Sequence, residues 1–165
     1  MKTNKNPRIS RKRLRKTRKG GNLSNFIVKY NISLHRNIPN KLSLEQTAIA
    51  PSVFFIPENG KLYTILMYDP DAPAKPSWVH WIITNISTPE TISYSTVLSY
   101  SMPNPPYGTT HRYFFGLYEQ QSGKINPMIS GIRGGFDYNS FVKENNLKLV
   151  NQIIMTVSAK NIASK

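Results

Sequence analysis

The chain has 165 residues, with 22 lysines and arginines, 8 aspartates and glutamates, and no cysteine. This length suits one ordinary domain with its own core, and the lack of cysteine excludes disulfides and thiolate chemistry. No apolar run approaches the roughly 18 residues that span a bilayer, and no apolar signal-peptide stretch follows the cationic N-terminus. We therefore predict a cytoplasmic protein that is not secreted and has no transmembrane segment.

The formal net charge of +14 lies mostly near the N-terminus. Residues 1–19 carry ten lysines and arginines and no acid, whereas the rest of the chain has a net charge of only +4. Apart from Ile9 and Leu14, residues 1–22 have almost no apolar side chain to offset the entropy lost on folding. We predict a disordered basic arm over residues 1–22 and a folded β domain over residues 23–165.

Beyond the arm, short apolar and β-branched runs alternate with clusters of Pro, Asn, Gly and Ser, which is typical of strands joined by turns. The predicted strands cover residues 26–34, 52–56, 62–68, 79–86, 111–118 and 151–157. One short helix is predicted after Asp137, which serves as its N-cap, and it ends at Asn145-Asn146. The pattern indicates a mainly β domain, an antiparallel sandwich of sheets with one short helix.

Six of the twelve prolines fall into two groups beside titratable residues. Those groups are Pro70, Pro73 and Pro76, and Pro103, Pro105 and Pro106. Proline fixes φ and removes a backbone donor, so both loops should be stiff and should preform a pocket. We expect Pro73 or Pro106 to hold a pocket wall, and a cis peptide bond at one of them would suit a tight turn.

Strand alternation predicts which side chains share that pocket. Residues two apart on a strand face the same side, so Trp78 accompanies His80 and His111 accompanies Tyr113. A carboxylate, Asp69, ends the most hydrophobic strand candidate, where the chain turns. On the opposite face of the His111 strand lies Arg112, for which we expect an ion pair with Asp71.

The sequence gives less support to a metal site, a hydrolase or a phosphate loop at these residues. Carboxylate and imidazole groups at Asp69, His80 and His111 could bind zinc or iron, but their spacing does not require it, and we predict no metal and no cofactor. A hydrolase based on Asp69 and His80 is the least favoured alternative, because no nucleophile accompanies the pair. The glycines of residues 131–135 lack the strand-to-helix pattern of a phosphate loop. A lone histidine on a strand is, besides, more often structural than functional.

Two ordered motifs resemble the phosphatidylethanolamine-binding protein family. One reads GKLYTILMYDPDAP over residues 60–73 and continues as WVHWIITN over residues 78–85, and the other reads PPYGTTHRYFF over residues 105–115. The resemblance implies a large antiparallel sheet packed on a smaller one, with a shallow pocket that binds phosphate or phosphorylated head groups. Carried over residue by residue, the pocket would be lined by Asp69, Trp78, His80, His111 and Tyr113, with Pro73 and Pro106 as rigid walls.

The resemblance also implies a role. Family members mostly modulate signalling proteins and proteases and are not catalysts, so we predict a non-enzymatic protein that binds a phosphate or phosphoethanolamine-type anion or a phospholipid head group and modulates such a partner. Two departures affect the pocket: the loop between Pro73 and His80 is shorter than in animal members, and Asn104 stands where a glycine is usual.

The arm supports an alternative from another functional class. Its cations could bind nucleic acid or an anionic membrane through residues 1–20, with the β domain as a carrier, or could form a nuclear targeting signal. A solvated tail is an equally good interpretation. Residues 15–21 and the richness in Asn, Ile, Ser and Lys resemble proteins of giant DNA viruses, which would place the chain in host cytoplasm or in a virion.

Overall fold

A computed structural model describes residues 26–30, 40–87 and 94–159, and the predicted arm lies outside them. The strands are β1 (Ile27–Lys29), β2 (Asn40–Leu42), β3 (Ser52–Phe54), β4 (Tyr63–Asp69), β5 (Trp78–Ile86), β6 (Ser95–Leu98), β7 (Thr110–Gln120) and β8 (Leu147–Ser158). The helical elements are the 3-10 turn η1 (Glu45–Thr47) and helix α1 (Tyr138–Glu144). Among these residues, no helix is long and apolar enough to cross a membrane.

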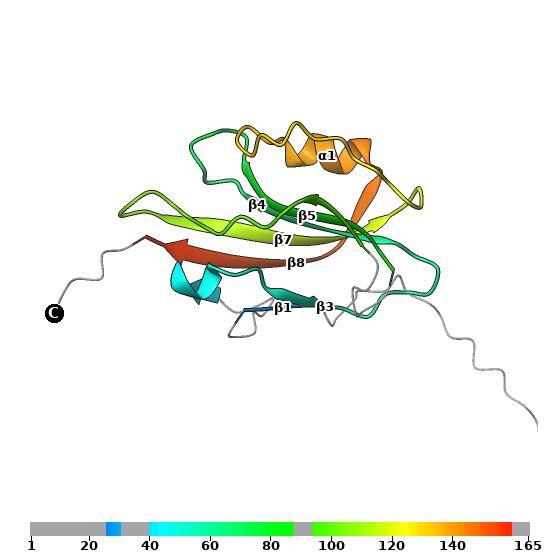
Figure 1. Cartoon of the computed structure of the whole chain (residues 1–165), viewed down its shortest axis with the longest axis horizontal. Coiled ribbons are helices and arrows are strands. Elements are labelled where there is room, and N and C mark those ends of the chain that lie inside the picture. The colour runs from blue at the N-terminus through cyan, green and yellow to red at the C-terminus, as the bar shows by residue number, and fades with distance from the viewer. Residues whose placement is uncertain (1–25, 31–39, 88–93, 160–165) are drawn as a thin grey trace, which may run out of the picture.

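Three layers make up the domain (Figure 1). The middle layer is a six-stranded sheet in the order β2-β8-β7-β4-β5-β6, and the second sheet pairs β1 with β3. Helix α1 lies over one face of the large sheet and the small sheet lies under the other. This mainly β architecture of a large sheet, a smaller sheet and one short helix is the predicted one.

Strand β4 occupies the inner part of the large sheet, and all seven of its residues are buried. Its alternate side chains enter two different cores: Ile65 and Met67 pack toward the small sheet, whereas Leu66 and Tyr68 pack toward the helix. A strand covered on both faces reads as a continuous apolar run and not as an alternation. The run YTILMY therefore determines the position of this strand between two layers.

Helix α1 closes the second core. The Asp137 carboxylate accepts hydrogen bonds from the backbone amides of Asn139 and Ser140, as an N-cap does. On the buried side, Phe141 enters the core and the ring of Tyr138 stacks on Tyr68 with centroids 4.2 Å apart. The predicted cap and the predicted helix are both confirmed.

The structure differs from the predicted strands in detail. Strands β2 and β6 were not predicted, and β7 and β8 each extend beyond the predicted ranges. The large sheet is antiparallel except where β2 runs parallel to β8. Both additional strands are short and lie at the two edges of the sheet, where pairing with a neighbour, and not local sequence preference, determines the conformation.

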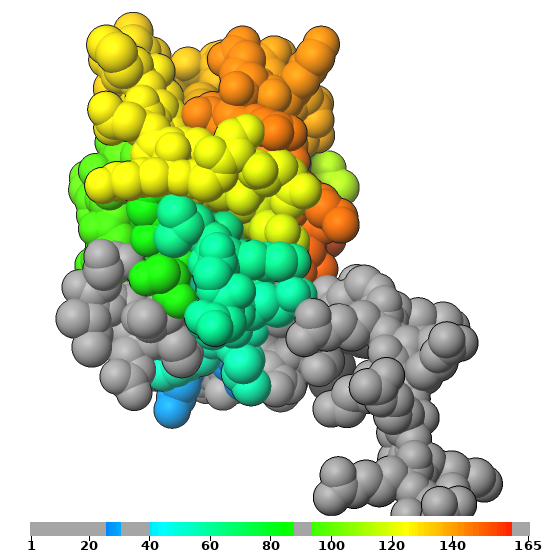
Figure 2. Space-filling view, turned by 90° about the vertical axis from the view of Figure 1, so that its right-hand side faces the viewer, coloured from blue at the N-terminus to red at the C-terminus, as the bar shows by residue number. Residues whose placement is uncertain are grey.

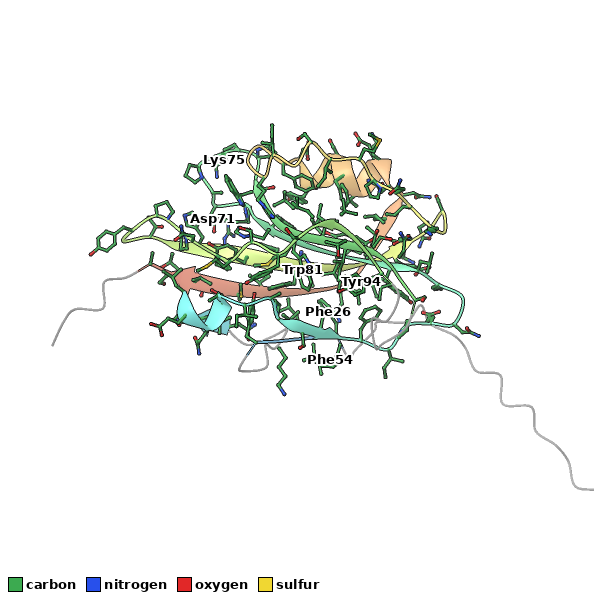
Figure 3. All side chains as sticks on the ribbon, in the orientation of Figure 1. Phe26, Phe54, Asp71, Lys75, Trp81 and Tyr94 are labelled. Carbon is green, nitrogen blue, oxygen red and sulfur yellow. The ribbon has the colours of Figure 1, made fainter. Side chains whose placement is uncertain are left out.

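Antiparallel pairing brings the end of β4 and the beginnings of β5 and β7 to one end of the sheet. Asp69 pairs with Trp78, and Tyr68 pairs with Phe114. Figure 3 labels Asp71 and Lys75 in the loop at this end. Figure 2 shows the opposite end, where the loop before β4 meets the end of β7 and Lys61 forms a 3.1 Å ion pair with Glu119.

Candidate functional site

A cavity of about 310 Å³ opens where β4 ends and β5 and β7 begin. It is lined by Asp69, Ala72, Pro73, Trp78, His80, Ser101, Met102, Asn104, Pro106, His111 and Tyr113. The seven residues predicted from the sequence to form a site are all in this set. The structure thus brings them together around one space, while their contact with a ligand stays a prediction.

Asp69 and His111 form a buried pair in the lining of the cavity. Asp69 is 3% exposed, His111 is 7% exposed, and Nδ1 of the histidine lies 2.8 Å from Oδ2 of the carboxylate. The other oxygen, Oδ1, accepts hydrogen bonds from the backbone amides of Asp71 (2.7 Å) and Ala72 (3.1 Å). Since a carboxylate only accepts, Nδ1 of His111 carries the proton of this bond, and Nε2 is the nitrogen left for a ligand.

His80 is held in the same way by a different acceptor. Its Nδ1 donates to the backbone carbonyl of Ser101 over 2.8 Å, so here too Nε2 is left for a ligand. Burial lowers the pKa of His80, and it outweighs the opposing effects of the Ser101 carbonyl and the Asp69 charge. Around neutral pH the empty cavity therefore presents the unprotonated Nε2 of His80.

Tyr113 contributes a hydroxyl group that the protein leaves unused. The residue is fully buried, its ring meets His80 edge-on at 5.1 Å, and its hydroxyl has no hydrogen-bond partner in the described part of the chain. Burial raises the pKa of Tyr113, as does the Asp69 charge; the nearby Asn104 amide opposes this but falls short of hydrogen-bond geometry. The phenol therefore keeps its proton and can donate it to a ligand.

The walls of the cavity are apolar and proline-rich. Pro73 and Pro106 both line it, and Trp78 and Met102 are partly exposed at its margin. The prediction of a cis bond at Pro73 or Pro106 is wrong: among the described residues, the cis X-Pro bond lies between Lys75 and Pro76.

The predicted ion pair between Arg112 and Asp71 is confirmed. Nη2 lies 2.7 Å and Nε 2.9 Å from the two carboxylate oxygens, and the backbone amide of Arg112 adds a third bond. These bonds lower the pKa of Asp71 to about 2. The pair faces away from the cavity and ties the 69–73 turn to β7 beside His111.

Comparison with known proteins decides the family. The sequence profile described as phosphatidylethanolamine-binding protein matches residues 28–155, which is most of the chain. The chain belongs to the phosphatidylethanolamine-binding protein family.

Two curated relatives of this family member are partial matches. The 26 kDa secreted antigen of Toxocara canis is 30% identical over 124 residues, which cover 67% of this chain and 47% of the antigen. Protein CENTRORADIALIS of Antirrhinum majus is 34% identical over 96 residues, which cover 53% of this chain and 52% of that protein. The chain thus spans about half the length of the curated relatives it matches.

Solved structures share the fold. Carboxypeptidase Y inhibitor, crystallised in complex with its cognate proteinase, superposes with a TM-score of 0.69 and 25% identity over 82% of this chain and 83% of the inhibitor. The phosphatidylethanolamine-binding protein from Plasmodium vivax gives a TM-score of 0.66 and 20% identity over 81% and 84%.

Some residues of the site were not anticipated from the sequence. Ser101, Met102 and Ala72 line the cavity, and Arg133 lies behind His80, where it donates to that residue's backbone carbonyl. Ser101 and Arg133 bond to distant segments of the chain, for which no local sequence pattern exists. In the described ranges of the chain, no three His, Asp or Glu side chains gather as a metal site requires.

Proposed function

We propose that this family member is a non-enzymatic binding protein that holds a phosphate-type anion, free or as part of a phosphorylated head group, in the cavity between Asp69, His80, His111 and Tyr113. The observation that carries the proposal is which polar atoms of His80, His111 and Tyr113 have hydrogen-bond partners in the protein. Two buried imidazoles have their Nδ1 atoms committed to protein acceptors, and a buried hydroxyl has no partner. Buried polar groups are normally satisfied, so the unpartnered Tyr113 hydroxyl beside these two imidazoles supports a ligand at this place.

The chemistry favours an anion once the imidazoles gain protons. A protonated Nε2 on each histidine and the Tyr113 hydroxyl would supply three donors, and charge-assisted hydrogen bonds contribute roughly 1.5 to 3 kcal/mol each. The Asp69 carboxylate accepts the Nδ1–H of His111 with one oxygen and two backbone amides with the other, so both oxygens are occupied by protein donors. Asp69 is therefore an orienting group and not a ligand contact.

The same geometry favours binding over catalysis. A nucleophile needs a base within hydrogen-bond reach, yet His80 bonds to the carbonyl of Ser101 and His111 bonds to Asp69. Neither imidazole is paired with a hydroxyl group in the described residues of the site.

We further propose that this protein, with an anion in its cavity, modulates a protein partner in the cytoplasm. The partner would be a signalling protein or a protease. The support is the relation to carboxypeptidase Y inhibitor, which was solved in complex with its proteinase and reaches 25% identity with this chain.

Equilibrium binding of inorganic phosphate and of phosphoethanolamine to the full chain tests the anion site. We expect His111→Gln to weaken both at least tenfold, since one charge-assisted donor is lost, and His35→Gln, outside both motifs, to bind as wild type does. Equal affinity of wild type and His111→Gln, or no binding to wild type, would refute the proposal.

A second candidate function rests on residues 1–19, which carry ten cations and no acid. Such a segment can neutralise nucleic-acid phosphates and release their counterions. We propose it as an independent, sequence-tolerant nucleic-acid contact, whose salt dependence separates it from the anion cavity.

A further inference from the structure

The loop of residues 131–135 lies against the beginning of β5. The Arg133 carbonyl accepts from the Val79 amide at 2.9 Å, Gly134 forms a bridge with Trp78, and the Phe136 amide donates to Ser77 at 3.0 Å. In Figure 3 the loop runs beside Lys75. It therefore backs the segment that supplies Trp78 and His80 to the cavity.

Close approach at this loop requires glycine. A Cβ atom at Gly134 would lie 2.9 Å from Cβ of Ala74 and 3.3 Å from the Trp78 ring. Gly135 has a φ of +72°, in the left-handed region that favours glycine. The two glycines let the Arg133 backbone lie directly on β5.

The Arg133 side chain joins three backbone carbonyls from two separate segments. Nη1 donates to Val79 (3.2 Å) and His80 (2.9 Å), and Nη2 donates to Ser99 (2.8 Å). Only a planar guanidinium offers several N–H groups in a fixed fork that can span such a set. The ion pairs found among the described residues do not include Arg133.

The segment after Ser99 is the one that orients His80. The Ser101 amide donates to the His80 carbonyl at 2.9 Å, and the His80 ring donates back to the Ser101 carbonyl. Arg133 bonds both to the His80 backbone and to Ser99, two residues before Ser101. It therefore fixes the distance between His80 and Ser101.

We propose that Arg133 is a positioning residue of the cavity: its guanidinium clamps the 99–101 segment onto β5 and thereby fixes His80 with Nδ1 protonated and Nε2 offered to the ligand. The ligand in this inference is that of the proposed function, but the clamp itself is a property of the empty protein. The clamp also places the positive charge of Arg133 close to His80, and among the described residues no carboxylate forms an ion pair with that charge.

Three charged or titratable groups act on His80 from the elements around it. Arg133 and His111 disfavour its protonated form and Asp69 favours it, and burial is a larger cause than any of them. Loss of the Arg133 charge would raise the pKa of His80, but loss of the fork should release the Nδ1–H bond to Ser101, which lowers that pKa and is the larger effect. The tautomer of His80, and not its pKa, therefore reports the clamp.

Nitrogen NMR of the three histidines in the ligand-free chain, with sulfate titration as a second readout, tests the clamp. In Arg133→Met we expect His80 to lose its single Nδ1–H tautomer and sulfate affinity to fall about tenfold. Arg133→Lys keeps the charge but loses the fork, so the tautomer should still become mixed. Lys124→Met, which removes an exposed cation from a distant loop, should change none of these.

The outcomes separate the clamp from the proposed anion site. An unchanged His80 tautomer in Arg133→Lys or in folded Arg133→Met would overturn the inference, whatever sulfate does. If wild type does not bind sulfate but the His80 tautomer changes as expected, the clamp stands and the proposed function fails. If Arg133→Met does not fold by circular dichroism, Arg133→Lys alone decides.

Discussion

The Asp69 carboxylate and the His111 imidazole form one buried unit, joined by a 2.8 Å hydrogen bond between residues that end β4 and begin β7. The bond determines which nitrogen of His111 carries a proton, and it places a negative charge behind the ring.

Asp69→Asn tests that relationship. The amide can present either an N–H or a carbonyl to His111, and the two backbone amides of Asp71 and Ala72 favour the carbonyl toward themselves. We expect the His111 tautomer to switch to Nε2–H, and sulfate affinity at about pH 6 to fall severalfold, because the anion then meets a neutral Nε2–H donor in place of a charged one. Nitrogen NMR and calorimetry measure the two effects, and an unchanged tautomer would contradict the assignment.

Tyr113→Phe separates ligand binding from stability. The hydroxyl makes no hydrogen bond within the described residues, so its removal should leave the free energy of unfolding unchanged or raise it by up to about 1 kcal/mol. Affinity for sulfate should fall by about 1.5 to 3 kcal/mol, because the acceptor is charged. Chemical denaturation and calorimetry give both values, with Tyr94→Phe, at a partly exposed site, as the control. A variant that is less stable but binds normally would show that the hydroxyl serves the fold.

The prolines of the cavity wall should matter more for binding than for stability. Pro73→Ala and Pro106→Ala each increase the freedom of the unfolded chain, which costs about 0.4 to 1 kcal/mol. Beyond that, a loosened wall should weaken sulfate binding severalfold, whereas Pro57→Ala, at the opposite end of the domain, should affect stability alone. Sulfate affinities that match wild type in both wall variants would show that these prolines do not preorganise the site.

Deletion of residues 1–20 tests the arm. The truncated chain should keep its circular dichroism and its sulfate affinity, but it should lose most retention on DNA or RNA, because ten of the cations are removed. Nucleic-acid binding by the full chain should weaken steeply as salt rises. A truncated chain with the same salt slope would place nucleic-acid binding in the β domain instead.

Much of the site follows from local sequence. Residues two apart on a strand face the same side, and this alone placed Trp78 with His80 and His111 with Tyr113. The Asp-Pro-Asp-Ala turn is equally local, since Asp69 caps the amides that immediately follow it. Arg112 could be paired with Asp71 because strand alternation excludes it from the cavity.

The edge strands and the position of Arg133 depend on contacts between distant segments and could not be predicted from the sequence. Strands β2 and β6 exist because neighbours offer them hydrogen-bonding partners at the sheet edges, and their sequences NKL and STVL have no distinctive pattern. Arg133 binds carbonyls more than 30 positions away, which any residue type could supply. The positions of such partners come only from the folded chain.

The protons taken up on anion binding test the central claim most directly. Sulfate keeps its double negative charge near neutral pH, so any proton gained must go to the protein. Because burial lowers the pKa of His80, its Nε2 is unprotonated in the empty cavity and must gain a proton before it can donate to the anion. Affinity should therefore rise as pH falls through the neutral range and fade as pH rises. Calorimetry of sulfate binding at about pH 7 in two buffers of different ionisation enthalpy should give an uptake of roughly one proton or more per anion; binding with no proton uptake would contradict the account.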